Sequence, residues 1–203
     1  MARFPGRPGR VHITGGPGSG KSTRASRLGR QLGVPVHDLD WVGWGGTGGL
    51  RPLAVLLPEV YIIAAEPEWI TEGAMLGWTD PLFRAADLVI WLDVPWRVAL
   101  WRMVLRHIRA ELRGNNRHRG VGRLLRFLWY TRHYYTGSAP PGLIPMDGDG
   151  QETRRETVHR LAAYPDKSIR LRRPAVVRAL LTRIGQIPHS DGDASEVGRD
   201  AGR

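Results

Sequence analysis

The chain contains no cysteine, and only two of its 30 basic residues are lysines, Lys21 and Lys167. The absence of cysteine excludes disulfides and every zinc site built on thiolate ligands. The seven histidines do not show the spacing of metal ligands, so we expect no structural metal. Because arginine takes the place of lysine almost everywhere else, Lys21 stands out as a residue with a chemical role of its own.

Long apolar runs are also absent from the sequence. No stretch of 18 or more apolar residues occurs, and the N-terminal segment lacks the apolar core of a secretion signal. We therefore expect a soluble, cytoplasmic protein with no membrane partner. A chain of 203 residues with 41% apolar content predicts one main domain. We place this domain at 1–184 and predict a disordered polar tail at 185–203.

Acidic residues are scarce in one part of the chain. The net charge is +11, and the segment from Arg97 to Tyr135 holds ten arginines but only one acid, Glu111. This segment alone therefore carries a charge of +9, while the remainder is nearly balanced. A basic surface of this density favours polyanionic partners, such as nucleotides, nucleic acid or anionic surfaces.

Short apolar runs alternate with segments of helical periodicity along the chain. We predict strands at 10–14, 34–39, 69–71, 87–92 and 168–171, helices at 21–32, 52–65, 98–112, 121–135, 152–163 and 174–184, and a flexible linker at 41–49. Such alternation predicts an α/β three-layer sandwich, in which helices cover both faces of a parallel sheet and ligands bind beyond the carboxyl ends of the strands. Four candidate site residues follow predicted strands: Gly15, Asp40, Glu72 and Asp93.

The segment GGPGSGKST at 15–23 matches the phosphate-binding pattern GxxxxGK[ST] through Gly15, Gly20, Lys21 and Ser22. Its glycines let successive backbone N–H groups point into one concavity at the start of a helix, where an anion binds. Lys21 would reach the β- and γ-phosphates, and the Ser22 hydroxyl would bind Mg²⁺. A chance glycine-rich turn is disfavoured, because a strand precedes the motif and a helix follows it.

The roles of two aspartates at strand ends, Asp40 and Asp93, are open. Asp38 and Asp40 alternate along the predicted strand, so only one of them readily faces the phosphate loop, and Asp40 is the better candidate. Asp40 would hold Mg²⁺ or accept a proton from an acceptor hydroxyl, or else serve as a turn or N-cap residue. Asp93 is either a magnesium-side carboxylate or the N-cap of the arginine-rich helix, and we favour the cap.

The predicted helix at 98–112 carries a row of arginines beside an apolar stripe that includes Trp101. Arg102, Arg106, Arg109 and Arg113 form this row, which is either a solvated face or a surface for an anion. Phosphoryl transfer needs such cations, and we select Arg102 and Arg132 as catalytic candidates. We expect Trp101 to pack in the core, whereas Trp41 and Trp44, after Asp40, are freer to contact a ligand.

The motifs GGPGSGKST, VHDLDWVGW, WITEGAM, RAAD, LDVPWRVALWRMVLR and FLWYTRHYY occur in this order over roughly 10–184. In this order they resemble those of the adenylate-kinase-like P-loop proteins called DNA topology modulation proteins, a branch close to shikimate and gluconate kinases. The resemblance implies a P-loop NTPase fold with a five-stranded parallel sheet and a mobile helical-hairpin lid at about 96–136. It also implies an acceptor near Asp40 and Glu72, lid arginines at Arg102 and Arg132, and adenine near Arg173. The ATP phosphates would lie on Gly15, Gly16, Pro17, Gly18, Ser19, Gly20, Lys21, Ser22 and Thr23.

Two functions fit these features. The first is an ATP- and Mg²⁺-dependent kinase that transfers the γ-phosphoryl group to the hydroxyl or phosphate of an unknown small molecule or nucleotide. The alternative is a nucleic-acid-binding ATPase that is switched by nucleotide and affects DNA topology. The local basic charge suits both, but the sequence holds no recognised DNA-reading motif, which favours the kinase.

Overall fold

The computed structural model describes residues 6–45, 51–74, 77–114, 120–137 and 153–187. The strands are β1 (Arg10–Thr14), β2 (Val36–Asp38), β3 (Trp69–Glu72), β4 (Leu88–Leu92) and β5 (Ser168–Leu171). The helices are α1 (Lys21–Leu32), α2 (Leu39–Trp44), α3 (Leu53–Ala65), α4 (Asp80–Ala85), α5 (Trp96–Leu112), α6 (Val121–Thr136), α7 (Arg154–Ala162) and α8 (Pro174–Gln186), with a short 3₁₀ turn at Pro165–Lys167.

The five strands form one parallel sheet in the order β2-β3-β1-β4-β5. Strand β1 lies at its centre and pairs with both β3 and β4. All residues of β3 and β4 are buried, as expected when helices cover both faces of a parallel sheet. The predicted α/β three-layer fold is therefore confirmed. Because the strands run in the same direction, the residues after β1, β2, β3 and β4 meet at one edge.

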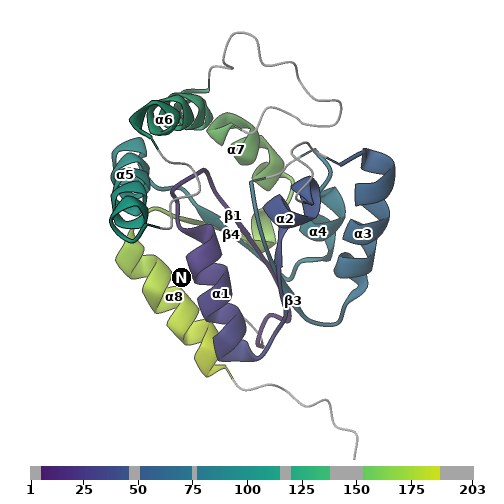
Figure 1. Ribbon diagram of the computed structural model, residues 1–203. Coiled ribbons are helices and arrows are strands. Elements are labelled where there is room, and N and C mark those ends of the chain that lie inside the picture. Colours follow the sequence, from purple (N-terminus) through teal and green to yellow (C-terminus); the bar gives the residue numbers. More distant parts are fainter. Residues whose placement is uncertain (1–5, 46–50, 75–76, 115–119, 138–152, 188–203) are drawn as a thin grey trace, which may run out of the picture.

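Two apolar clusters lie on opposite faces of the sheet. On one face, α1 and α8 pack side by side over the sheet through Leu28 and Leu181 (Figure 1). On the other face, α3 and α4 contribute Leu56 and Phe83, joined by residues of α2 and α7. The sheet therefore holds the phosphate loop and the start of α1 rigidly between two cores.

The alternation of side chains along β1 places one histidine in the interior. Val11 and Ile13 pack toward α1 and α8, whereas His12 points to the other face, where its ring meets the edge of Phe83 at 4.5 Å between centroids. His12 is fully buried, and its Nδ1 lies 2.8 Å from Thr71 Oγ1. Burial lowers the pKa of His12 to about 3, so this side chain is neutral in the folded protein.

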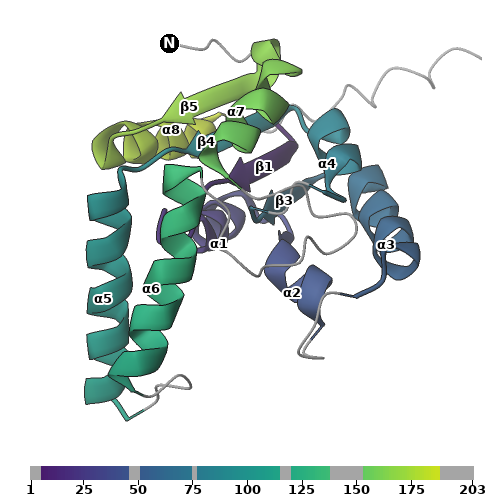
Figure 2. The ribbon, with the colours of Figure 1, turned by 90° about the horizontal axis from the view of Figure 1, so that it is seen from above.

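Helices α5 and α6 form an antiparallel hairpin that projects from the body of the molecule (Figure 2). Only the base of this α5–α6 hairpin is packed, around the buried residues Val94, Ala99 and Met103. Trp101 is 63% exposed and Leu112 is 83% exposed. The prediction that Trp101 packs in the core is therefore wrong: its face of α5 meets no second layer.

Several predicted boundaries change in the structure. Helix α2 occupies 39–44, so the predicted linker is wrong over 41–44, while most of the remaining linker lies outside the described residues. Helix α4 was not predicted, and α8 continues to Gln186, beyond the predicted end of the domain. The rest of the predicted disordered tail, from 188 onward, also lies outside the described residues. No helix in the described ranges is long and apolar enough to cross a bilayer.

Candidate functional site

The phosphate-binding motif lies between the carboxyl end of β1 and the N-terminus of α1. Gly18 and Gly20 have left-handed backbone conformations, with φ of 77° and 86°. Other residues adopt this region only with strain, so the loop needs glycine at both positions. Gly20 is the N-cap of α1, and no side chain caps this helix. The first N–H groups of α1 therefore stay available for an anion.

Lys21 lies between two carboxylates from the neighbouring strand ends. Its Nζ is 3.6 Å from Glu72 Oε2 and 3.9 Å from Asp40 Oδ2. The Glu72 side chain is 2% exposed, whereas that of Asp40 is 54% exposed. One carboxylate is thus a buried partner of the lysine, and the other is open to solvent.

The environment of Glu72 perturbs its ionisation. Burial raises the pKa of Glu72, the Lys21 charge and a hydrogen bond with Ser22 oppose this rise, and Asp38 and Asp40 add to it. Glu72 Oε2 is buried and has no hydrogen-bond partner, and the same is true of Ser19 Oγ in the phosphate loop. A phosphate group, an ion or a water molecule bound at the loop would complete the bonding of these two oxygens.

The oxygens around Lys21 suit Mg²⁺. This ion is usually held by one or two carboxylates together with phosphate oxygens and water, rather than by a complete protein cage. Ser22, Glu72 and Asp40 supply a hydroxyl and two carboxylates beside the phosphate loop. No group of three or more His, Asp or Glu residues suited to a metal occurs in the described part of the chain.

Asp38 directs the chain so that Asp40 reaches the lysine. Its side chain accepts hydrogen bonds from the backbone N–H groups of Asp40 at 2.9 Å and Trp41 at 3.3 Å, and so caps α2. Asp40 then lies in the first turn of α2 rather than in a strand. Asp38 as N-cap and Gly45 in the left-handed conformation at the C-cap bracket this helix. Both are sequence signals that could have predicted α2.

Two arginines bind backbone carbonyls of the phosphate loop. Arg102 of α5 donates to the Ser19 carbonyl at 2.9 Å, and Arg24 of α1 donates to the Gly20 carbonyl at 3.0 Å. Burial lowers the pKa of Arg24, and the charges of Arg102 and Arg178 lower it further. Two cations, Arg24 and Arg102, therefore lie against the loop.

Two tyrosines at the end of α6 cover the tip of the loop. Tyr135 Oη donates to the Pro17 carbonyl at 2.7 Å, and a Cβ on Gly16 would lie 2.4 Å from the ring of Tyr134. Burial, then the Tyr134 and Asp93 charges, raise the pKa of Tyr135, so it stays a hydroxyl donor. Sequence reasoning missed this contact, because Tyr135 and Pro17 lie 118 positions apart in the chain.

A cavity of about 800 Å³ opens beside the phosphate loop and runs along α5. The loop residues Pro17 to Arg24 line it, together with Asp40, the arginine row of α5 (Arg102, Arg106, Arg109 and Arg113) and Phe127 of α6. The exposed arginine row thus faces the same space as Lys21. Arg132, Arg173, Trp41 and Trp44 do not line this cavity: Arg132 is exposed on α6, and Arg173 is the exposed N-cap of α8.

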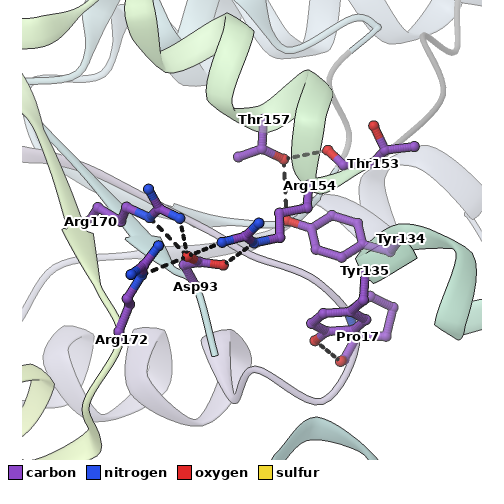
Figure 3. A network of polar contacts seen from close by, with 9 residues as sticks. All are labelled: Pro17, Asp93, Tyr134, Tyr135, Thr153, Arg154, Thr157, Arg170 and Arg172. Carbon is purple, nitrogen blue, oxygen red and sulfur yellow. Dashed lines mark hydrogen bonds and ion pairs between the residues drawn. The ribbon is translucent and has the colours of Figure 1, made fainter. Parts of the chain in front are cut away.

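Asp93 has neither of its expected roles. The N-cap of α5 is Pro95, and no side chain caps the helix. Asp93 instead binds Arg154 of α7 at 2.7 Å, Arg170 of β5 at 2.6 Å and Arg172 at 3.2 Å (Figure 3). The carboxylate is buried and saturated by arginines, so it is not available to a metal ion. Two residues separate Asp93 from the helix start, and this distance removes it from the cap position.

The Asp93 network joins the strand ends to the tyrosines over the phosphate loop. Tyr134 Oη lies 3.2 Å from Thr157 Oγ1 of α7, the helix whose first residue is Arg154 (Figure 3). Burial opposes ionisation of Asp93, but the hydrogen bonds and charges of Arg154 and Arg170 outweigh it and lower the pKa of this carboxyl. Asp93 is therefore a charged connector among β4, β5 and α7.

Comparison with known proteins gives limited matches. No family model matches the chain. It is 33% identical over 108 residues to the uncharacterized Bacillus subtilis protein YqaC, a match that covers 52% of this chain and 59% of that protein. The matched region therefore spans less than two thirds of YqaC.

Solved structures that are similar to the chain include three kinases. Shikimate kinase from Bacteroides thetaiotaomicron is 16% identical, with a TM-score of 0.45 over 87% of this chain and 96% of that one. A gluconokinase from Sinorhizobium meliloti 1021 is 18% identical, with a TM-score of 0.45 over 88% and 94%. Shikimate kinase from Aquifex aeolicus is 22% identical, with a TM-score of 0.36 over 45% and 63%. At these identities the likeness says nothing about the reaction.

Proposed function

We propose that the protein is a phosphotransferase, which uses Mg²⁺-ATP to phosphorylate a hydroxyl or phosphate group of an acceptor. One observation carries this proposal: Lys21 Nζ lies within 4 Å of a buried and an open carboxylate, at the wall of a cavity that the phosphate loop and a row of arginines line. Phosphoryl transfer needs this combination of an anion nest, mobile cations and a carboxylate near the attacking oxygen.

The residues of the motif bind the nucleotide in this proposal. The backbone N–H groups between Gly15 and Thr23, except at Pro17, which has none, hold the phosphates. Lys21 neutralises the β- and γ-phosphates, and Ser22 with Asp40 would hold Mg²⁺. When bound, this ion neutralises charge between the β- and γ-phosphates. Arg173, before α8, contacts the adenine. The exposed Asp40 accepts the proton of the acceptor hydroxyl, and Glu72 keeps Lys21 oriented.

The α5–α6 hairpin, at about 96–136, serves as a lid. It belongs to a kinase domain that we place at 1–184. The hydrogen bond from Arg102 to the Ser19 carbonyl supports this role, because it couples the hairpin to the loop that holds the phosphates. Closure would bring more arginines over the transferred group and exclude water. Arg132 reaches the transferred group only after such a movement, because it lies outside the cavity.

The resemblance of the motifs to DNA topology modulation proteins remains a prediction, since no family model matches the chain. A nucleic-acid-binding ATPase that is switched by nucleotide and affects DNA topology is the second candidate function. The exposed Arg123 and Arg126 on the hairpin favour it, because they face solvent outside the cavity, where a duplex backbone could contact them. A cytoplasmic location is likewise a prediction.

ADP release from Mg²⁺-ATP tests the proposal, with and without a pooled mixture of nucleosides, nucleotides and metabolites. The pool should stimulate the wild type but not Lys21→Ala, whereas Arg27→Ala, an exposed arginine on the same helix outside the cavity, should behave as wild type. Stimulation by duplex DNA alone would replace the kinase with the ATPase. Equal ATP turnover by Lys21→Ala and the wild type would refute the site itself.

A further inference from the structure

The arginine row of α5 extends well beyond the phosphate loop. Arg102 contacts the loop, and Arg106, Arg109 and Arg113 follow along the same wall of the cavity. With a rise of about 1.5 Å per residue, Arg109 lies roughly 10 Å and Arg113 roughly 16 Å along the helix from Arg102. A triphosphate held by the loop places its charge at the Arg102 end. The outer arginines therefore face a part of the cavity that this triphosphate does not fill.

No acid of the described residues forms an ion pair with these outer arginines. The single acid of α5 is Glu111, and its carboxylate lies 3.6 Å from His107. Arginines at spacings of three and four residues repel one another on a helix, so the row costs stability unless an anion binds. Three cations spread over about 10 Å match an anion that repeats along a line better than a single phosphate group.

An aromatic ring also lines the cavity. Phe127 of α6 lines the same cavity as the arginine row and is 41% exposed. Grooves that bind single-stranded nucleic acid combine cations that follow the backbone with aromatic side chains on which bases stack. The described residues that line the cavity thus supply both elements on the two helices of one hairpin.

We infer that the acceptor is a single-stranded nucleic acid, whose phosphodiester groups bind along Arg106, Arg109 and Arg113 and one of whose bases stacks on Phe127. This inference rests on the proposed phosphotransferase activity and names its acceptor. A terminal hydroxyl oxygen of the strand attacks the γ-phosphorus of ATP, and a new P–O bond forms. The bond from the γ-phosphorus to the bridging oxygen of ADP breaks, and the hydroxyl proton passes to Asp40.

Transfer of labelled γ-phosphate to thymidine, to a dT trimer and to a dT hexamer tests the acceptor. Each oligonucleotide is prepared in three forms, with free hydroxyls at both ends, at one end or at neither, so that the label shows which terminal hydroxyl is phosphorylated. We expect the catalytic efficiency to rise from thymidine to hexamer and label to be absent when both ends are blocked. Equal efficiency for all three lengths, or transfer only to compounds without phosphate, would overturn the inference and leave the phosphotransferase intact.

A charge-matched pair of variants tests the arginine row. Arg109→Gln/Arg113→Gln should raise the KM for the hexamer about fivefold and leave the KM for ATP unchanged. The control Arg123→Gln/Arg126→Gln removes the same charge from exposed positions of the same hairpin outside the cavity. Equal KM values for the two double variants would contradict the proposed path of the strand.

Binding of a fluorescent dT hexamer separates the inference from the activity. The plot of log affinity against log salt concentration has a negative slope. In Arg109→Gln/Arg113→Gln this slope should become less steep by about 0.7 for each lost phosphate contact. If the hexamer binds in this way but no acceptor is ever phosphorylated, the proposed function fails and the binding site stands. A hexamer that binds wild type no better than the double variant would refute the site, whatever the protein phosphorylates.

Discussion

Lys21 Nζ lies 3.6 Å from Oε2 of Glu72, a carboxylate that is almost completely buried behind the phosphate loop. The ion pair orients a mobile lysine in the absence of nucleotide, but the pKa of Glu72 is nevertheless raised, mainly by burial. The charged form of Glu72 is thus less favourable in the folded protein than in the unfolded chain. Glu72 therefore orients Lys21 in the site but lowers the free energy of unfolding when it is charged.

Glu72→Gln should separate activity from stability. Stability from Glu72 increases as pH falls through its raised folded pKa toward the ordinary value of 4.5, and is lost as pH rises above that folded pKa. At pH 7 the variant should therefore unfold at the same or a higher temperature than wild type, while turnover falls about 100-fold. Thermal unfolding at pH 7 and ADP release measure the two effects. A large loss of stability would show that the ion pair outweighs burial.

His12 should make the protein sensitive to mild acid. Its folded pKa is lowered from 6.5 to about 3, so the unfolded chain binds a proton that the folded protein excludes, and stability is lost as pH falls between these values. Between pH 6 and 5 the free energy of unfolding of wild type should fall by about 1.4 kcal/mol per pH unit more than that of His12→Gln. Urea titrations across this range provide the measurement, and parallel curves would contradict it.

Gly16→Ala should displace the end of α6. Its Cβ would lie 2.4 Å from the Tyr134 ring, and relief of this overlap should cost about 1–3 kcal/mol of unfolding free energy. Gly122→Ala on α6 meets nothing within 4 Å, so it should be neutral or stabilise by up to about 1 kcal/mol. In a double-mutant cycle with Tyr134→Ala, the loss of unfolding free energy in the double variant should be smaller than the sum of the two single losses. Strict additivity would show that the overlap with Tyr134 is not the source of the strain.

Tyr135→Phe should loosen the phosphate loop without unfolding the protein. The change removes the donor to the Pro17 carbonyl, a bond worth about 1 kcal/mol, and should weaken ATP binding about fivefold. Calorimetric titration of ATP measures this change. Tyr61→Phe, on an exposed face of α3, is the control and should bind as wild type. Unchanged affinity in both variants would mean that the loop holds its shape without α6.

Asp93→Asn should destabilise the protein by about 1–3 kcal/mol, since three arginines lose a charged partner but remain partly in contact with water. The pKa of Asp93 is lowered, so its contribution is present above the ordinary value of 3.8 and is lost as pH falls through the lower folded value. Urea unfolding at pH 7 should therefore show the full difference. Identical midpoints would show that the arginines find equivalent partners.

Local patterns in the sequence predicted most of the sheet and of the phosphate loop. The motif around Lys21 specifies its own strand, turn and helix, and the short apolar runs of β1 and β4 are recognised without knowledge of distant residues. The site around Lys21 was predictable to the extent that parallel strands share one carboxyl edge. Glu72 ends β3, which lies next to β1, and Asp40 follows β2, which lies next to β3. The two carboxylates therefore meet near Lys21.

The errors arose where contacts between distant residues decide the role. Asp93 looked like a helix cap until Arg154 and Arg170, 61 and 77 positions further along the chain, were brought to it by α7 and β5. The periodicity that includes Trp101 predicts a buried face only if a second layer covers it, and the α5–α6 hairpin projects without one. A short helix such as α2 gives too few turns for periodicity to show.

The Asp93 network also bears on how the protein is made. A ribosome releases the chain from its N-terminus, so β1, α1 and the phosphate loop emerge long before Arg154, Arg170 and Arg172. Until those residues are synthesised, Asp93 lacks its partners, β5 cannot pair with β4, and α7 cannot support Tyr134. A nascent chain that ends before β5 should thus expose an incomplete nucleotide site, and nucleotide binding should begin only after β5 has been synthesised.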